Sequence, residues 1–274
     1  MAAMPIWKSN GLLSFTINLQ EAAPWVWHKN WINSAYTASG ELKPAYMQRL
    51  ERILNAADSL QMVPIVGLFY FGQDHNLKDE AAVLTAVENA INWLMDKGYR
   101  NILIETANEI DVHDWHHDIF SKERAHELIE KVKSLQRNGF RYPVGVSYAG
   151  GNLPGQKVAS TVDYLLLHGN GVNNPEGITK QIDSAIALVG NRTIPIVYNE
   201  DDHFNFDQED YNLKRAVEKH VSWGYFDYRM AQHGETAYEE GFQSVPVDWG
   251  INSVRKKAFL ASLKRLHAGQ TQLK

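Results

Sequence analysis

The feature that most constrains the fold is an alternation of short apolar runs with stretches of helical period. Seven apolar runs of strand length follow one another along the chain. Runs of this kind fit strands that are buried on both faces, as in a parallel sheet. They lie at 11–19, 62–71, 101–107, 142–148, 162–168, 193–199 and 223–230. Because helices are predicted between most of them, the order predicts an α/β fold with a parallel sheet.

The helices are predicted from apolar residues that recur at spacings of three and four positions. One such helix is predicted at 44–61. Two more are predicted at 79–98 and 121–139, and each of these ranges ends on a glycine, where helices commonly stop. A final helix is expected at 253–269. Neither a low-complexity linker nor a block of like charges interrupts this pattern, which predicts one domain over 1–274.

A (β/α)8 barrel of the TIM type accounts for the pattern if its first strand is absent. Such a barrel has eight strands, whereas the sequence contains seven candidates. Residues 1–10 resemble the end of a helix that leads into the strand at 11–19, so most of the first helix is expected to be absent too. An open doubly wound sheet is less well supported, because "GNGVNNPEG" at 169–177 lacks the spacing of a phosphate-binding loop.

Composition and charge exclude several classes of function. A net charge of −5 and a pI near 6.1 leave no basic stripe for a nucleic acid. The chain has no cysteine, which excludes disulfides and thiolate metal sites, and it has no apolar run long enough for a membrane span. The first residues lack the features of a signal peptide, so secretion or a periplasmic location would require a leader ahead of this sequence. The compartment is therefore left open.

Two Asn-Glu pairs mark the candidate catalytic residues. Glu109 closes the apolar stretch "ILIETANEI" (102–110), and Glu200 follows the strand predicted at 193–199. Their separation is 200 − 109 = 91 residues, or three strand–helix units of about 30 residues each. Strand ends three units apart face each other across the mouth of a barrel, where catalytic residues lie. Two opposed carboxylates are the arrangement that glycoside hydrolysis requires.

The glutamates are expected to have different roles. Glu109 is interpreted as the general acid/base, with a pKa raised by its apolar strand, and Glu200 as a nucleophile kept ionised by hydrogen-bond donors. Glu105 lies four residues before Glu109, so the alternation of a strand places both on the same side. A carboxylate inside an apolar run is costly to bury, and Glu105 is therefore expected to be a hydrogen-bonded support.

The stretch "ILIETANEI" resembles the fourth-strand motif of clan A glycoside hydrolases, in particular the cellulase-like family 5. Residues 40–69 resemble the second helix and third strand of that family. The resemblance implies a barrel glycosidase that cleaves β-linked glycans or glycosides by a retaining mechanism, with Glu109 as acid/base and Glu200 as nucleophile. It also implies substrate contacts for Asn108 and for His168, which stands where the family often has a histidine. No cofactor is implied.

The chain departs from the family pattern at several positions, which indicates a divergent branch. Ile110 stands in place of the usual proline, and the strand at 11–19 has Thr16 and Asn18 but no arginine. Asn170 occupies the place of a tyrosine in the sixth-strand motif, and it too is predicted to contact substrate.

Further substrate contacts are predicted at the mouth of the barrel. Tyr70 and Gln73 end one strand, and Tyr198 directly precedes the second Asn-Glu pair. The loop at 23–31 contains three tryptophans, of which Trp25 is the first. Aromatic rings of this kind either stack on sugar rings or anchor the loop through their own burial.

Two other classes of function remain open. The stretches 110–118 and 199–203 are rich in Asp, Glu and His, which suits a metal-dependent sugar isomerase or epimerase; the favoured interpretation has no metal. A catalytically inactive barrel that binds glycans is the third class. A missing strand would also leave two unpaired strand edges, and we expect these to be closed by self-association or by a longer natural chain.

Overall fold

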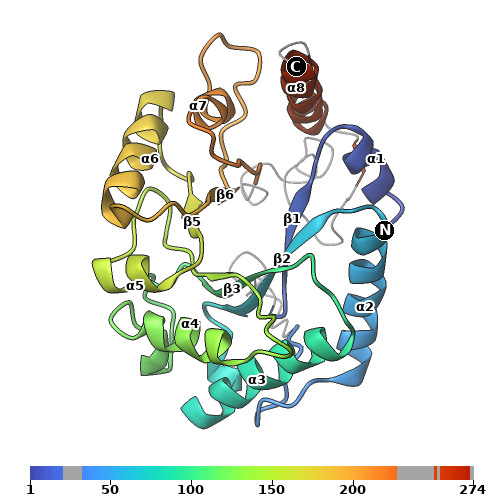
Figure 1. Cartoon of the computed structure of the whole chain (residues 1–274), viewed down its shortest axis with the longest axis vertical. Coiled ribbons are helices and arrows are strands. Elements are labelled where there is room, and N and C mark those ends of the chain that lie inside the picture. Colours follow the sequence, from blue (N-terminus) through green and yellow to red (C-terminus); the bar gives the residue numbers. More distant parts are fainter. Residues whose placement is uncertain (21–32, 227–249, 252–253, 272–274) are drawn as a thin grey trace, which may run out of the picture.

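The strands form a parallel α/β arrangement in which the helices lie on the outside (Figure 1). The computed structural model describes residues 1–20, 33–226, 250–251 and 254–271. Six strands lie within these ranges. They are β1 (Ser14–Asn18), β2 (Val63–Tyr70), β3 (Leu103–Asn108), β4 (Val144–Gly145), β5 (Leu165–His168) and β6 (Ile196–Glu200).

The strands follow the order of the chain. β1 to β4 form one parallel sheet, and β5 pairs with β6 in parallel. A backbone hydrogen bond from Asp163 N to Val144 O, at 2.9 Å, connects β4 to the start of β5. Val197 of β6 pairs in parallel with Ser222, which extends the series by one position. Within the described residues the series curves around a centre without closing into a continuous ladder.

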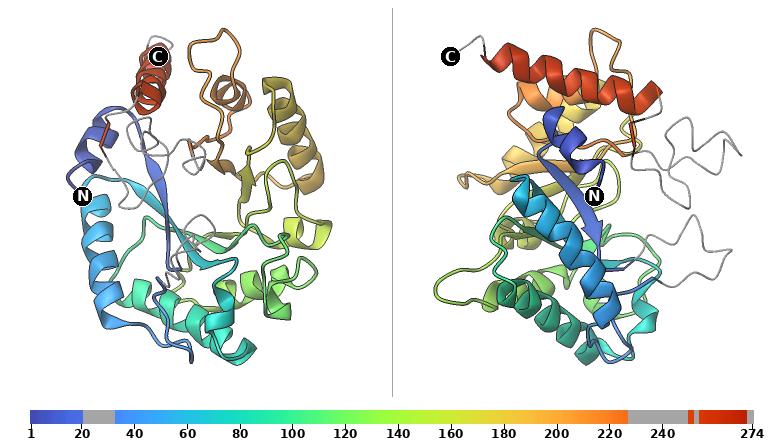
Figure 2. Two further views of the ribbon diagram at one scale, coloured as in Figure 1. Left: turned by 180° about the vertical axis from the view of Figure 1, so that it is seen from behind. Right: turned by 90° about the vertical axis from the view of Figure 1, so that its right-hand side faces the viewer.

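Helices surround the strands on their outer side (Figures 1 and 2). Two short 3-10 helices, Asp74–Asn76 and Asp118–Phe120, follow β2 and β3. The α-helices are α1 (Met4–Ser9), α2 (Pro44–Ser59), α3 (Glu80–Asp96), α4 (Ala125–Ser134), α5 (Gln156–Thr161), α6 (Pro175–Val189), α7 (Asn212–Glu218) and α8 (Val254–Thr271).

Local sequence signals explain where two of these helices begin. The side chain of Asp79 accepts a hydrogen bond from Ala82 N at 2.7 Å and so caps the N-terminus of α3. Asn174 does the same for α6 through Gly177 N at 2.8 Å. Caps of this kind satisfy backbone donors that the first turn leaves unpaired, and each contributes about 1 kcal/mol.

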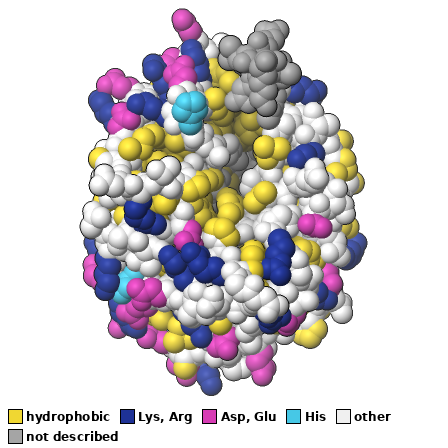
Figure 3. Space-filling model, viewed as in Figure 1, with side chains coloured by type: hydrophobic (Ala, Val, Ile, Leu, Met, Phe, Trp, Pro, Cys, Tyr) yellow, Lys and Arg dark blue, Asp and Glu magenta, His cyan; other side chains and the backbone are white. Residues whose placement is uncertain are grey.

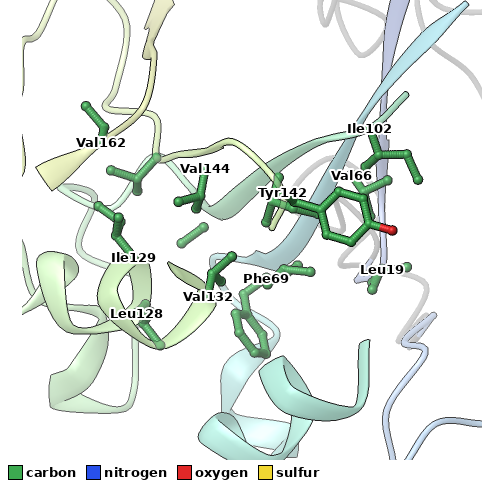
Figure 4. Close-up of a cluster of buried hydrophobic side chains, with 14 of the residues drawn as sticks. Leu19, Val66, Phe69, Ile102, Leu128, Ile129, Val132, Tyr142, Val144 and Val162 are labelled. Atoms are coloured by element: carbon green, nitrogen blue, oxygen red, sulfur yellow. The ribbon is translucent and has the colours of Figure 1, made fainter. Parts of the chain in front are cut away.

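The hydrophobic core lies between the strands and the surrounding helices (Figure 4). Leu128, Ile129 and Val132 of α4 are fully buried, and they belong to the same buried cluster as Val144 of β4. Burying an aliphatic side chain of this size contributes roughly 1.5–3 kcal/mol. The largest buried cluster includes residues as far apart in the chain as Leu19 and Leu260, so these elements share one core.

The sequence-based prediction of a parallel α/β fold is confirmed, with differences in detail. The strand expected at 142–148 is limited to Val144–Gly145, and the helix expected at 121–139 is the shorter α4. Of the strand expected at 223–230, residues 223–226 form no strand after the pairing at Ser222, and the remainder lies outside the described residues.

The surface seen down the shortest axis is hollowed near its centre (Figure 3). Hydrophobic side chains gather around this hollow, and charged side chains of both signs lie mainly towards the edges of the view. In the described part of the chain, none of the helices has the length and apolar character needed to cross a lipid bilayer.

Candidate active site

Two glutamates and a histidine meet at the carboxyl ends of three strands. Nδ1 of His168 lies 2.9 Å from Oε1 of Glu109 and 3.6 Å from Oε2 of Glu200. One side-chain oxygen from each glutamate and one ring nitrogen all lie within 4.8 Å of one another. The three residues that the sequence predicted from separate motifs therefore form one cluster.

A local irregularity at the end of β6 positions Glu200. Leu167 pairs with Tyr198 and His168 pairs with Glu200, so Asn199 is an extra residue on β6. An extra residue of this kind is a β-bulge, and it changes the direction of the side chains that follow. The bulge places Glu200 beside His168, while the Asn199 amide donates to Thr16 Oγ1 of β1 at 3.3 Å.

The backbone of Glu109 has an unusual conformation. Its φ is 50°, in the left-handed region that non-glycine residues seldom occupy. Residues held in this way cluster at functional sites, where the surrounding structure must fix them. Here the Glu109 N–H donates to Ser147 Oγ at 2.9 Å, and the Glu109 carbonyl accepts from the Trp115 indole at 3.1 Å.

His168 is completely buried, yet it favours the protonated form. Burial alone would lower its pKa, but the negative charge of Glu200 and the hydrogen bond to Glu109 outweigh that effect and raise the pKa to about 9. At neutral pH the imidazolium therefore lies between two carboxyl groups.

The pKa of Glu200 is also raised, but here burial is the cause. Burial raises its pKa above the ordinary value, although the charge of His168 and a hydrogen bond from Asn170 Nδ2 at 3.1 Å both lower it. The sequence predicts that hydrogen-bond donors keep this carboxyl group ionised, and Asn170 is such a donor. The effect of burial on the pKa of Glu200 is nevertheless larger than the effects of His168 and Asn170.

Glu105 lies deeper among the strands and is fully buried. Its Oε1 accepts a hydrogen bond from Ser147 Oγ at 2.5 Å. Burial raises its pKa to about 7, against the lowering effects of His168 and Ser147. This environment agrees with the supporting role that the sequence predicts for Glu105.

Buried polar atoms without a protein partner gather around this cluster in the described residues. Buried polar groups are normally hydrogen-bonded, so such atoms are suited to contact a polar ligand. They include Asn18 Oδ1, Glu105 Oε2, Asn108 Nδ2, His168 Nε2, Asn170 Oδ1 and Asn199 Oδ1.

Other predicted contacts lie at the same strand ends. Tyr70 is paired in register with Asn108, and both are buried. Gln73 follows β2, is 4% exposed and has an Oε1 atom without a partner among the described residues. Trp25 lies outside the described residues.

Tyr198 is placed elsewhere, which corrects its predicted contact with substrate. Its hydroxyl group donates to Gln181 Oε1 of α6 at 2.8 Å, and the side chain is 1% exposed. The reason is the bulge at Asn199, since Tyr198 would otherwise share a side with Glu200. Tyr198 joins β6 to the outer helix.

Neither Ser147 nor Asp201 was predicted as a site residue from the sequence. Ser147 follows β4 and bonds both Glu105 and Glu109. Asp201 follows Glu200 and is fully buried; its carboxyl group accepts from His203, Asn212 and Trp223. A small serine in an apolar run gives no signal by itself, and Asp201 was visible only as part of an acidic stretch.

Solved structures similar to this chain include glycoside hydrolases of family 5. A broad-specificity endoglucanase from Clostridium longisporum superposes with a TM-score of 0.63 at 14% identity, covering 97% of this chain and 86% of its own. A family 5 enzyme from Prevotella bryantii, solved with a xyloglucan tetradecasaccharide, has a TM-score of 0.62 at 13% identity. The match covers 96% of this chain and 85% of that enzyme. A broad-specificity endoglucanase from Ruminococcus flavefaciens has a TM-score of 0.64 at 13% identity, and the match covers 96% of this chain and 85% of that enzyme.

The sequence itself matches no protein-family model and no curated protein. The structural likeness establishes the fold, which is that of the (β/α)8 barrels of family 5 glycoside hydrolases. The predicted fold class is thereby confirmed.

Proposed function

We propose that this protein is a retaining glycoside hydrolase that acts on a β-linked glycan or glycoside. The observation that carries the proposal is the close approach of the two glutamates, because one carboxyl oxygen of Glu109 and one of Glu200 lie within 4.8 Å of each other. Retaining glycosidases have their two carboxyl groups about 5–5.5 Å apart, whereas inverting ones leave about 6.5–9.5 Å for a water molecule. The spacing thus supports direct attack by one carboxylate on the sugar.

The mechanism has two steps. In the first, Glu109 gives its proton to the glycosidic oxygen as that bond breaks, and the Glu200 carboxylate attacks the anomeric carbon to form a glycosyl ester. In the second, Glu109 takes a proton from water, the water oxygen attacks the same carbon, and the ester bond breaks. The sugar leaves with its original anomeric configuration, and both glutamates return to their starting states.

His168 has an electrostatic role in this scheme. Negative charge lies on Glu200 before the first step and on Glu109 in the glycosyl-enzyme. Because Nδ1 of His168 lies 2.9 Å from one carboxyl group and 3.6 Å from the other, its charge can stabilise whichever of the two is ionised.

Substitution of each glutamate tests the proposal. Glu109→Gln and Glu200→Gln are assayed on β-glucans and aryl β-glycosides beside Glu176→Gln, a matched change at an exposed position of α6. We expect both active-site variants to lose at least about 10³-fold in kcat, and the control to match the wild type. An active wild type with either variant near full rate would contradict the assignment.

Azide assigns the two roles. With Glu200→Ala, azide attacks the anomeric carbon in place of the missing carboxylate, so the product has inverted configuration. With Glu109→Ala, the glycosyl-enzyme still forms on an activated aryl glycoside, and azide then releases a product of retained configuration. The opposite pair of products would exchange the roles of Glu109 and Glu200.

A divalent-cation site is the second candidate, because Glu109, His168 and Glu200 could supply three ligand atoms. A metal needs a neutral imidazole, and the raised pKa of His168 opposes that state at neutral pH. The neighbouring group at 201–203 is also engaged internally, since the Asp201 carboxyl group already accepts four hydrogen bonds. Activity lost on chelation and restored by Mn²⁺ or Zn²⁺ would favour an isomerase or epimerase.

Glycan binding without cleavage would indicate an inactive barrel.

A further inference from the structure

Ser147 contacts the backbone on both sides of Glu109. It is fully buried and lies two residues beyond the end of β4. Its N–H donates to Ala107 O at 3.4 Å, and its carbonyl accepts from Ile110 N at 3.0 Å. Between these two contacts, its hydroxyl oxygen accepts from the N–H of Glu109 at 2.9 Å. Ser147 therefore holds the turn that carries the acid/base candidate before, at and after Glu109, while the Trp115 indole holds the Glu109 carbonyl.

That turn needs such a contact. With a φ of 50°, Glu109 has left the strand conformation, and its N–H has no partner in the sheet. A buried donor left unpaired is unfavourable, and an extended conformation would direct the Glu109 carboxyl group away from its present position. In the observed conformation Oε1 of Glu109 lies 2.9 Å from Nδ1 of His168.

The hydroxyl group of Ser147 has its orientation set by Glu105. A serine hydroxyl has one hydrogen and two lone pairs. The hydrogen is directed to Glu105 Oε1 at 2.5 Å, and a lone pair is therefore available for the Glu109 N–H. Without a buried acceptor below it, the hydroxyl could turn its hydrogen towards that N–H and lose the contact.

We propose that Ser147 is a positioning residue which, oriented by Glu105, holds Glu109 in the conformation that brings its carboxyl group to His168. The kinetic part of this inference depends on the proposed glycosidase activity. The conformational part does not, because it concerns only the distance between Glu109 and His168.

The test measures both parts on Ser147→Ala. Ser262→Ala is the matched control, since Ser262 is also fully buried and hydrogen-bonded, through Ala258 O and Arg265, but lies on α8. The pKa of His168 is followed by NMR of histidine-labelled protein, with the signal assigned by its loss in His168→Asn. Rates are measured on the best β-glycoside found for the wild type, and Ser147→Thr tests rescue by a restored hydroxyl.

In Ser147→Ala we expect the pKa of His168 to fall by about one or more, because Glu109 no longer lies against Nδ1. We expect kcat to fall by about 10- to 100-fold with KM changed less than about twofold, the result of displacing a catalytic group by a fraction of a bond length. Ser147→Thr should recover a large part of both, and Ser262→Ala should change neither.

An unchanged His168 pKa in folded Ser147→Ala would overturn the proposal, whatever the effect of the substitution on kcat. Equal effects in Ser262→Ala would do so as well. If the wild type cleaves no glycoside, the proposed function fails while the His168 titration still decides the positioning role. Should Ser147→Ala not fold, Ser147→Cys replaces it in the titration, because a thiol fills similar space but is a weak acceptor.

Discussion

Nδ1 of the buried His168 lies 2.9 Å from Oε1 of Glu109, at the junction of β5 and the turn after β3. The contact joins two segments that are 59 residues apart in the chain. Burial lowers the pKa of His168, but the charge of Glu200 and this contact with Glu109 together outweigh burial and raise the pKa to about 9.

This contact predicts a stability that depends on pH. The folded protein holds the His168 proton more tightly than the unfolded chain, so the contribution is complete below about pH 6.5 and is lost as the pH rises through 9. The difference between the folded pKa of about 9 and the ordinary pKa of 6.5 corresponds to on the order of 3 kcal/mol in the free energy of unfolding. Urea denaturation of the wild type and His168→Asn at pH 6, 7.5 and 9 measures it. The two curves should converge as the pH rises; a constant gap would contradict the raised pKa.

Glu105 predicts a second pH dependence at lower pH. Its folded pKa of about 7 exceeds the ordinary 4.5, so the folded state is favoured below 4.5 and loses this contribution as the pH rises through 7. Glu105→Gln cannot ionise, and its amide oxygen can still accept from Ser147. We expect it to gain about 3 kcal/mol relative to the wild type between pH 4.5 and 8. The exposed change Glu176→Gln is the control, and a gain of the same size there would remove the explanation.

The main residues of the site were predictable from two general rules: the order of strands around a barrel, and the alternation of side chains along a strand. Strand-end glutamates spaced by three strand–helix units face each other in a barrel, and Glu109 and Glu200 do meet. The position of His168 came from the resemblance of its strand. Alternation along β3 also placed Glu105 on the side of Glu109.

What the sequence did not predict depends on backbone irregularity. Period-two alternation puts Tyr198 and Glu200 on one side of β6, but the extra residue Asn199 separates them. Ser147 was missed for a related reason. Ser147 is important because Glu109 has a left-handed backbone conformation, and the residue types at that turn do not predict a positive φ.

Asp201 should matter for stability as well as for the site. Its two oxygens accept four hydrogen bonds, from the backbone and ring of His203 and from the side chains of Asn212 and Trp223. In Asp201→Asn one oxygen becomes an amide NH2, so at least one buried donor loses its acceptor, at about 1–3 kcal/mol. Thermal and urea denaturation measure the loss.

Asp210→Asn is the matched control for that change. Asp210 pairs with Arg215 at the surface, where solvent screens such pairs and they contribute little to stability. Equal losses for Asp201→Asn and Asp210→Asn would show that the buried carboxyl group has no special structural role.

Gly150 is predicted to be required for the position of Asn170. A Cβ atom on Gly150 would lie 2.0 Å from the backbone oxygen of Asn170, so the Asn170 segment has to move. Asn170 donates to Glu200 Oε2 at 3.1 Å, and displacement breaks that contact. We expect Gly150→Ala to destabilise the fold by about 1–3 kcal/mol, as other overpacked sites do. We also expect it to lower kcat at least tenfold, as displaced catalytic contacts do.

Gly155→Ala is the control that isolates this effect. A Cβ atom on Gly155 would meet no neighbouring group within 4 Å, and the φ of −68° at this residue suits alanine. The variant should therefore leave stability and rate close to those of the wild type. The two variants are compared by urea denaturation and by kcat on the same β-glycoside. A Gly150→Ala protein with wild-type kcat would show that Asn170 does not support Glu200 during the reaction, because its displacement would then have no kinetic consequence.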